Sequence, residues 1–177
     1  MTQAGGGPAD RRGPLAFITL TVLLDTMGFG LIIPVLPTLV SELGGVPINE
    51  AATIGGTLIM TYALAQFLFA PVIGGLSDAH GRRPVLLMSM AGFSASMLVA
   101  AFATSLWMLF AGRVLAGITG ASYSTATAYI ADVTPPERRA QTFGLIGVAF
   151  GLGFIAGPAI GGLLGGIDVR YPFLAAA

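Results

Sequence analysis

Charge is scarce in this sequence. Only 9% of its 177 residues are charged, where a soluble domain carries about 25%, and 55% are hydrophobic. There is no cysteine, which excludes disulfides and thiolate metal sites, and no lysine, so all 8 basic residues are arginine. The formal net charge of zero argues for no nucleic-acid partner. A chain so poor in charge cannot cover a soluble globule of this length, and the composition predicts an integral membrane protein.

Groups for catalysis are equally scarce. The sequence has a single histidine and no cysteine, and no nucleophile lies near a base. We therefore expect no enzyme, no catalytic residue, no metal ligand set and no bound cofactor. A small-molecule substrate and membrane lipid remain as the expected partners.

Long uncharged runs are what the sequence has in abundance. Ala51–Ser77 and Pro84–Thr104 contain no charged residue, and each is long enough at about 1.5 Å per residue to cross a hydrocarbon core of about 30 Å. Because the runs are continuous rather than alternating, they predict helices and not a barrel. We predict an all-α membrane protein with spans at 15–40, 51–76, 84–104, 106–131 and 140–167, the start of a sixth at 171, and a mobile tail over 1–14.

The arginines lie on one side of these spans. Three pairs lie in the tail and in alternate loops, and the opposite loops carry acidic residues: Arg11, Arg12, Arg82, Arg83, Arg138 and Arg139 against Glu42, Glu50 and Asp168. The positive-inside rule makes the arginine side, and the N-terminus with it, cytoplasmic. The first run is too long for a signal peptide, and Asp25 lies at its middle.

Only Asp25 and Arg113 carry charge within the spans. Counted along their helices, they lie about 15 Å from the cytoplasmic face and about 10 Å from the outer face, so their heights differ by about 5 Å. We expect both to face one central cavity, where Asp25 binds a proton or a cation and Arg113 binds an anion or tunes Asp25. The alternatives are a helix-packing aspartate and a structural ion pair or carbonyl-capping arginine. Tyr62 and Gln66, four residues apart, share a helix face and suit the wall of that cavity.

Glycine recurs every four residues in the fifth span, at Gly153, Gly157, Gly161 and Gly165. This spacing lines one helix face with bare backbone, against which another helix can pack closely, and Pro158 bends the helix there. The seam fits either a rocking interface or ordinary tight packing. We expect its partner helix in a part of the molecule outside this sequence.

Four motifs together resemble the major facilitator superfamily, and within it the tetracycline-type drug/proton antiporters. Between the second and third spans, Gly74-x-Leu76-Ser77-Asp78-x-x-Gly81-Arg82-Arg83 is similar to the family's signature loop. Gly153-x-x-x-Gly157-Pro158-x-x-Gly161-Gly162 is similar to its fifth-helix antiporter signature. The segment Leu24–Pro37 resembles the first helix of tetracycline exporters, and Arg113 with Gly117 resembles the fourth-helix arginine motif.

The resemblance implies the N-terminal six-helix half of a twelve-helix bundle, with the sixth helix truncated and a C-terminal half missing. It implies a proton-coupled efflux antiporter in the bacterial inner membrane that exports a hydrophobic drug, as a cation or a magnesium chelate, by alternating access. Asp25, Gln66 and Arg113 match positions that handle substrate and proton. The loop implies a gate, in which Asp78 meets a helix N-terminus of the other half and Arg82 pairs with Asp132.

The sequence departs from the tetracycline pattern at Ser96, where an acidic residue is typical, and at Ala116, where glutamine is typical. Both departures leave other substrates open. The alternatives are a transporter of a sugar or anionic metabolite on the same fold, and an inactive fragment that needs a second half.

Overall fold

The computed structural model describes residues 12–120 and 122–177, and all the regular structure in that part of the chain is helical. The helices are α1 (Arg12–Ile32), α2 (Leu36–Gly44), α3 (Ile48–His80), α4 (Arg82–Ala101), α5 (Leu106–Thr119), α6 (Ser122–Val133), α7 (Pro136–Gly165) and α8 (Tyr171–Ala176). Residues 1–11 of the expected tail lie outside the described residues, and α1 already begins at Arg12. The short last helix begins at Tyr171, as expected.

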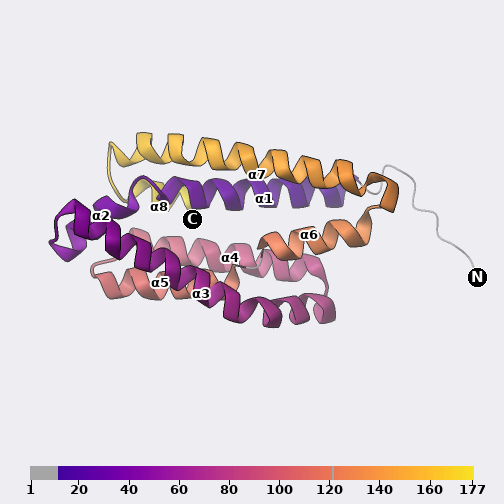
Figure 1. Cartoon of the computed structure of the whole chain (residues 1–177), viewed down its shortest axis with the longest axis horizontal. Coiled ribbons are helices and arrows are strands. Elements are labelled where there is room, and N and C mark those ends of the chain that lie inside the picture. The colour runs from indigo at the N-terminus through magenta and orange to yellow at the C-terminus, as the bar shows by residue number, and fades with distance from the viewer. Residues whose placement is uncertain (1–11, 121) are drawn as a thin grey trace, which may run out of the picture.

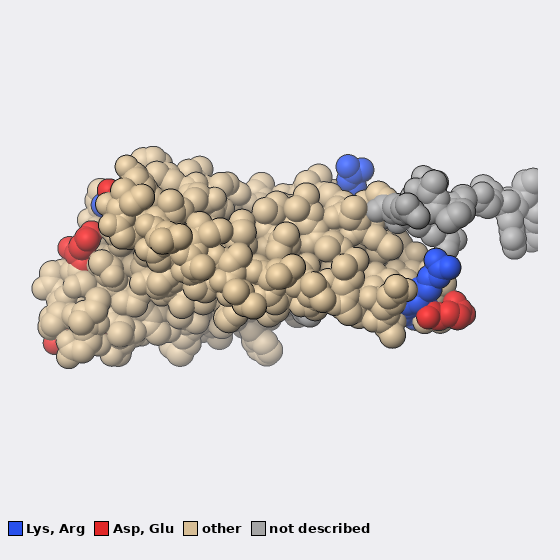
Figure 2. Space-filling view, turned by 90° about the horizontal axis from the view of Figure 1, so that it is seen from above, with Lys and Arg blue, Asp and Glu red and all other residues tan. Residues whose placement is uncertain are grey.

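The helices form an elongated bundle whose long axis follows the spans. Helices α1 and α7 run side by side along one flank, and α5 packs against both α3 and α4 on the other (Figure 1). Charged side chains on the face shown in Figure 2 lie toward the two ends of this axis, with an uncharged stretch between them. Within the described residues, four helices are long and apolar enough to cross a membrane: α1, α3, α4 and α7. The chain is therefore a helical membrane protein.

The structure divides the first expected span, 15–40, into α1 and α2. Residues 33–35 form a turn between them. Pro34 and Pro37 each lack the N–H that a continuing helix needs, and a proline ring clashes with the carbonyl four residues earlier. The turn is closed instead by the N–H of Val35, which donates to the carbonyl of Ile32 over 3.1 Å.

The fourth expected span, 106–131, is also divided, at Gly120. Helix α5 has 14 residues and α6 has 12, so neither is long enough on its own to count among the four apolar spans. Gly117 and Gly120 are poor helix formers, and the Thr119 hydroxyl donates to the Leu115 carbonyl over 2.9 Å, a bond that competes with the helix ladder. Hydropathy alone does not locate such a break.

The expected loop between the second and third spans is almost entirely helical. Helix α3 continues to His80 and α4 begins at Arg82, which leaves Gly81 as the turn. The φ of Gly81 is +92°, a left-handed conformation that side-chain-bearing residues rarely adopt. Asp78 therefore lies in the last turn of α3, and Gly74 lies one turn earlier in the same helix.

The glycine seam of α7 packs against α1. A Cβ at Gly153 would lie 2.8 Å from the carbonyl oxygen of Leu23, and one at Gly157 would lie 2.7 Å from that of Met27. The expectation that the partner helix lies outside this sequence is therefore wrong, because α1 supplies it. Gly162 belongs to the motif but not to the seam: it is exposed, and a Cβ there would meet nothing within 4 Å.

The two larger clusters of buried apolar side chains among the described residues lie on either side of the middle of the bundle. On α1, Ile18 and Val22 belong to the cluster toward the arginine end, and Ile32 belongs to the larger cluster toward the other end. Arg170 fixes α8 beside α4, because its guanidinium donates to the carbonyls of Ala101 and Ala103 over 2.9 and 3.1 Å. Asp25 lies on α1 between the two clusters.

Candidate functional site

Asp25 is half-buried at the middle of α1, and it lines two neighbouring cavities. Val22, toward the arginine end of the bundle, and Leu31, toward the opposite end, are buried apolar residues of the same helix. A carboxylate at this depth is costly unless it faces protein partners or water, and a cavity supplies such a setting. Its position is what the sequence predicted.

The larger cavity has a volume of about 200 Å³ and lies between α1, α3, α4, α7 and the α5–α6 break. We call it the aromatic cavity, because half of its lining residues are aromatic. Its walls are Val22, Asp25, Thr26, Phe29, Tyr62, Gln66, Phe93, Gly120, Phe150 and Phe154. The Phe150 and Phe154 rings stack with centroids 6.1 Å apart, and those of Phe29 and Tyr62 are 5.9 Å apart. The structure thus brings together three of the predicted site residues: Asp25, Tyr62 and Gln66.

Gln66 connects this cavity to the break in the fourth span. Its side-chain amide donates to the carbonyl oxygen of Gly120 and, over 3.1 Å, to the hydroxyl oxygen of Tyr62. A carbonyl at a helix end inside a membrane lacks the usual intrahelical partner, and an unsatisfied one costs several kcal/mol. Gln66 therefore positions the end of α5 and the Tyr62 ring as well as lining the cavity.

Arg113 lies elsewhere. It is 4% exposed, it lines neither cavity, and its Nη2 atom has no hydrogen-bond partner among the described residues. Two glycines of α5 let neighbouring helices approach closely, Gly112 on the side of α4 and Gly117 on the side of α3: a Cβ at Gly117 would lie 2.6 Å from the carbonyl oxygen of Tyr62. The guanidinium is enclosed by this packing. Arg113 therefore does not share with Asp25 either of the two cavities described here, and the expected common cavity stays a prediction.

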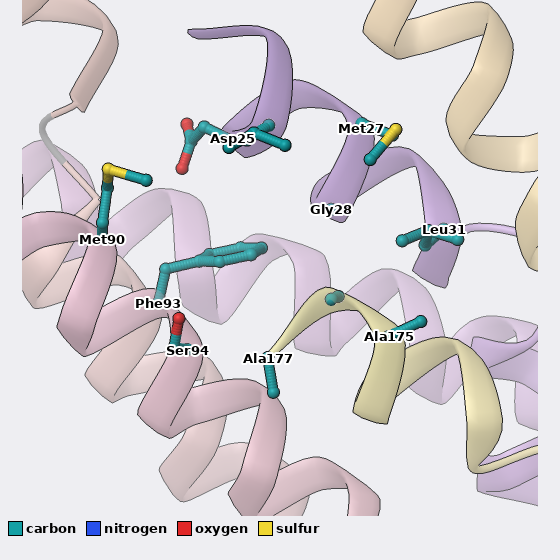
Figure 3. Close-up of a pocket in the computed structure, with 11 residues that line it drawn as sticks. Asp25, Met27, Gly28, Leu31, Met90, Phe93, Ser94, Ala175 and Ala177 are labelled. Carbon is teal, nitrogen blue, oxygen red and sulfur yellow. The ribbon is translucent and has the colours of Figure 1, made fainter. Parts of the chain in front are cut away.

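The second cavity has a volume of about 170 Å³ and lies between α1, α4 and α8. We call it the alanine cavity after the three alanines that end the sequence. Its walls are Leu24, Asp25, Met27, Gly28, Leu31, Met90, Phe93, Ser94, Ala175, Ala176 and Ala177. Asp25 from α1 and Met90 and Phe93 from α4 point into the same space (Figure 3). Asp25 and Phe93 line both cavities.

The arginine end of the bundle carries a three-residue ion-pair network. Arg82 lies 2.6 Å from Asp78 and 3.0 Å from Asp132, so the expected pairing of Arg82 with Asp132 is confirmed. Arg83 lies over the ring of Phe17, with its Cζ atom 5.5 Å from the ring centroid. These contacts tie α3 and α4 to α6 and α1 at one end of the molecule.

The residues that the structure describes, 12–120 and 122–177, include no group of three or more His, Cys, Asp and Glu side chains that could hold a metal ion. Asp25 is the acidic group in the cavities described above.

Residues 18–177 match the family model of the Major Facilitator Superfamily. The chain belongs to the Major Facilitator Superfamily. A tetracycline resistance protein of class C from Escherichia coli is 52% identical over 92% of this chain and 41% of the relative. The class G protein from Vibrio anguillarum is 51% identical over the same shares. Multidrug resistance protein 1 of Bacillus subtilis is 36% identical over 90% of this chain and 41% of the relative. The chain thus spans about 40% of the length of these relatives.

In this superfamily member, Asp25, Gln66 and Tyr62 could be found from sequence as cavity residues, but the phenylalanines could not. Phe29, Phe93, Phe150 and Phe154 lie within apolar runs, where any phenylalanine is expected to pack in the core or face lipid. The four-residue spacing of Phe150 and Phe154 places them on one helix face, but it does not indicate whether that face lines a cavity or meets lipid. Ser96, where tetracycline exporters typically carry an acidic residue, is buried and donates to the carbonyl of Phe93 over 2.7 Å.

Proposed function

We propose that this protein is a proton-coupled exporter of a hydrophobic, tetracycline-like drug that works by alternating access. The relatives named as tetracycline and multidrug resistance proteins support this proposal, because their identity to this chain reaches 52% and extends over nearly all of it. We further propose that transport needs the part of the relatives' length that this chain does not span. Drug efflux and antibiotic resistance are then its roles in the cell.

The observation that carries the proposal is the position of Asp25, a half-buried carboxylate in mid-span that lines two cavities. A carboxylate in such a place can hold either a proton or a cation, and the two compete for the same oxygen atoms. Binding of the drug, as a cation or a magnesium chelate, displaces the proton; return of a proton from the outside displaces the drug. The aromatic rings around Asp25 supply the apolar contacts and cation–π attraction that suit such a drug.

The ion pairs at the arginine end suit the gate of such a transporter. Arg82 is partly exposed and Asp132 is 56% exposed, so their pairing is worth at most about 1 kcal/mol. A contact this weak can open and close in each cycle. Asp132 lies on α6, whose other end adjoins the Gly120 break, so the gate and the cavity are joined by one short helix. We propose that breaking the pair opens the cytoplasmic side.

The charge distribution supports an orientation with the arginine end in the cytoplasm and a location in the bacterial inner membrane. Arg82, Arg83, Arg138 and Arg139 lie at or just beyond those ends of α3, α4, α6 and α7 that meet at one end of the bundle. The positive-inside rule assigns that end to the cytoplasm. Exit of the drug is then toward the end that carries α2 and α8.

The proposal is tested by replacing Asp25 with Asn in the complete gene product and assaying inverted membrane vesicles. Wild-type vesicles should take up tetracycline with magnesium when acidified inside, and drug addition should release protons from them. The Asp25→Asn change keeps the size of the side chain and removes its charge. We expect it to lower drug-driven proton release at least tenfold, and Asp132→Asn to reduce the rate with the drug affinity unchanged.

Glu42→Gln is the matched control, because Glu42 is exposed on α2 and lines neither cavity. It should transport like the wild type. Undiminished drug/proton exchange by the Asp25→Asn protein would contradict the role of Asp25. Exchange by residues 1–177 expressed alone would contradict the need for the remaining length. Transport of an anionic metabolite would require Arg113 to bind the anion. Because Arg113 lines neither cavity, we do not propose that substrate class.

A further inference from the structure

The two cavities meet at a single side chain from α4. Both the aromatic cavity and the alanine cavity are lined by Asp25 and Phe93, and they share no other lining residue. Asp25 reaches them from α1. Phe93 reaches them from the facing helix α4, and its ring extends toward α1 (Figure 3). Phe93 therefore stands between two spaces that have one carboxylate in common.

The Phe93 ring is held in this place by α1. A Cβ added at Gly28 would lie 2.8 Å from Cε1 of Phe93, closer than real carbon atoms approach. The ring therefore rests on the bare backbone of Gly28, three residues after Asp25. The side chain also packs against the larger apolar cluster of the bundle. Contacts on both sides make the ring a fixed wall rather than a loose side chain.

Size decides what each space can hold. The volumes are about 200 and 170 Å³, and drug-sized ligands occupy pockets of about 300–1,000 Å³. Each cavity alone is below that range, and the two joined lie within it. A ligand that extends from one cavity into the other must displace the Phe93 ring, and a ligand that stays within one cavity need not.

The two spaces also differ in chemistry. The aromatic cavity offers the Tyr62 hydroxyl and four phenylalanine rings, whose faces attract cations. The alanine cavity offers methyl and thioether groups, together with the Ser94 hydroxyl. The shared carboxylate favours a cationic group beside it in either case. The arrangement fits a ligand with its charge at Asp25 and its apolar body in one cavity or in both.

We propose that Phe93 is a specificity-determining residue: it divides a bipartite site for organic cations and sets the size of ligand that binds beside Asp25. This proposal rests on the proposed function, because it names the class of ligand that the same site selects. The proposal gives α4 a role in selecting the ligand, which the charged and polar residues of that helix do not indicate.

The test is equilibrium binding to the purified complete gene product, with two probe cations that carry the same charge. Tetraethylammonium is small enough for one cavity, and tetraphenylphosphonium needs both. Phe93→Ala should raise the ratio of tetraphenylphosphonium affinity to tetraethylammonium affinity at least tenfold, because it joins the cavities. Phe93→Leu should give an intermediate ratio, and Phe93→Tyr, which keeps the ring, should leave it within about twofold.

Phe67→Ala is the matched control, since Phe67 is 76% exposed on the outer face of α3 and lines neither cavity. Its ratio should equal that of the wild type. An unchanged or lower ratio in folded Phe93→Ala and Phe93→Leu proteins would overturn the proposal, and Phe93→Leu answers the question if Phe93→Ala does not fold. Binding can be measured without transport. A shifted affinity ratio in a protein that shows no drug/proton exchange would therefore contradict the proposed function and still support the role of Phe93.

Discussion

At the scale of single residues, Gln66 has a more definite task than the sequence alone indicated. Its amide donates to two oxygens, the carbonyl of Gly120 and the hydroxyl of Tyr62. Both acceptors line the aromatic cavity. The wall of this cavity opposite Asp25 is therefore a hydrogen-bonded unit built from α3 and the end of α5, and its shape depends on a donor at position 66.

We predict that Gln66→Glu destabilises the protein. Glutamate has almost the same shape but presents only acceptors when ionised, so the Gly120 carbonyl loses its donor and faces a negative charge. Leaving a buried acceptor unsatisfied costs about 1–3 kcal/mol. Thermal unfolding in detergent should show a lower midpoint.

Gln141→Glu makes the same chemical change at an exposed position of α7. Its midpoint should stay close to that of the wild type. If the two variants unfold at the same temperature, the Gln66–Gly120 bond does not hold the break in the fourth span. Gln66→Leu, which removes donor and acceptor together, should fall between Gln66→Glu and the wild type.

At the scale of whole helices, glycine determines which helices touch. On α7, a Cβ at Gly157 would lie 2.7 Å from the Cα of Gly30, while a Cβ at Gly147 or Gly151 would meet nothing within 4 Å. One helix therefore carries two kinds of glycine, one buried in a backbone-to-backbone contact with α1 and one facing open space. Tight packing of this kind replaces the hydrophobic driving force that helices lack in lipid.

We predict that Gly157→Ala and Gly151→Ala act in opposite directions. Alanine favours a helix over glycine by about 1 kcal/mol, and at Gly151 nothing offsets that gain. At Gly157 the added methyl group forces α1 and α7 apart, because the neighbouring atoms are backbone and cannot rotate away. Overpacking of this kind costs about 1–3 kcal/mol.

Unfolding in detergent, followed by the circular dichroism of the helices, measures both effects. Gly157→Ala should unfold at a lower temperature than the wild type, and Gly151→Ala at the same or a higher one. Equal loss in both variants would mean that the α1–α7 seam is not under steric constraint.

Hydropathy found the spans because lipid requires long apolar runs, and it missed the breaks because Gly120 and Pro34 are themselves apolar or neutral. The motif at Gly81 was correctly placed between two helices, but its residues were predicted to form a loop. In the structure most of them are helical, because the Gly81 φ of +92° lets one residue make the whole turn. Charge within a span located Asp25. It could not show that Arg113 is enclosed by α3 and α4, since that depends on close packing at Gly112 and Gly117.

At the scale of the molecule, the arrangement of charge defines its two ends. Arg82 and Asp132 pair at one end, and Arg170 joins α8 to α4 at the other. On the face shown in Figure 2, an uncharged stretch separates the two ends, as expected of a surface that meets hydrocarbon. Trp107, which is 82% exposed at the start of α5, lies toward the Arg170 end, where an amphipathic ring suits the interface of lipid and water.

We predict opposite accessibility for single cysteines placed at the two ends. These 177 residues contain no cysteine, so a single thiol can be read without background once any cysteine elsewhere in the gene product is replaced by serine. His80→Cys lies beside the Gly81 turn, and Thr104→Cys lies between α4 and α5; both positions are exposed. A membrane-impermeant maleimide added to intact cells should label the Thr104→Cys protein at least tenfold faster than the His80→Cys protein. Opening the membrane should remove the difference.

Phe67→Cys is the control for the middle of the bundle, because its position on α3 is exposed only to lipid if the spans are placed correctly. Maleimide reacts with the thiolate, which hardly forms in hydrocarbon, so this protein should stay unlabelled before and after the membrane is opened. Rapid labelling of the His80→Cys protein in intact cells would reverse the orientation and, with it, the proposed direction of transport. Labelling of the Phe67→Cys protein from either side would show that this face of α3 meets water and not lipid.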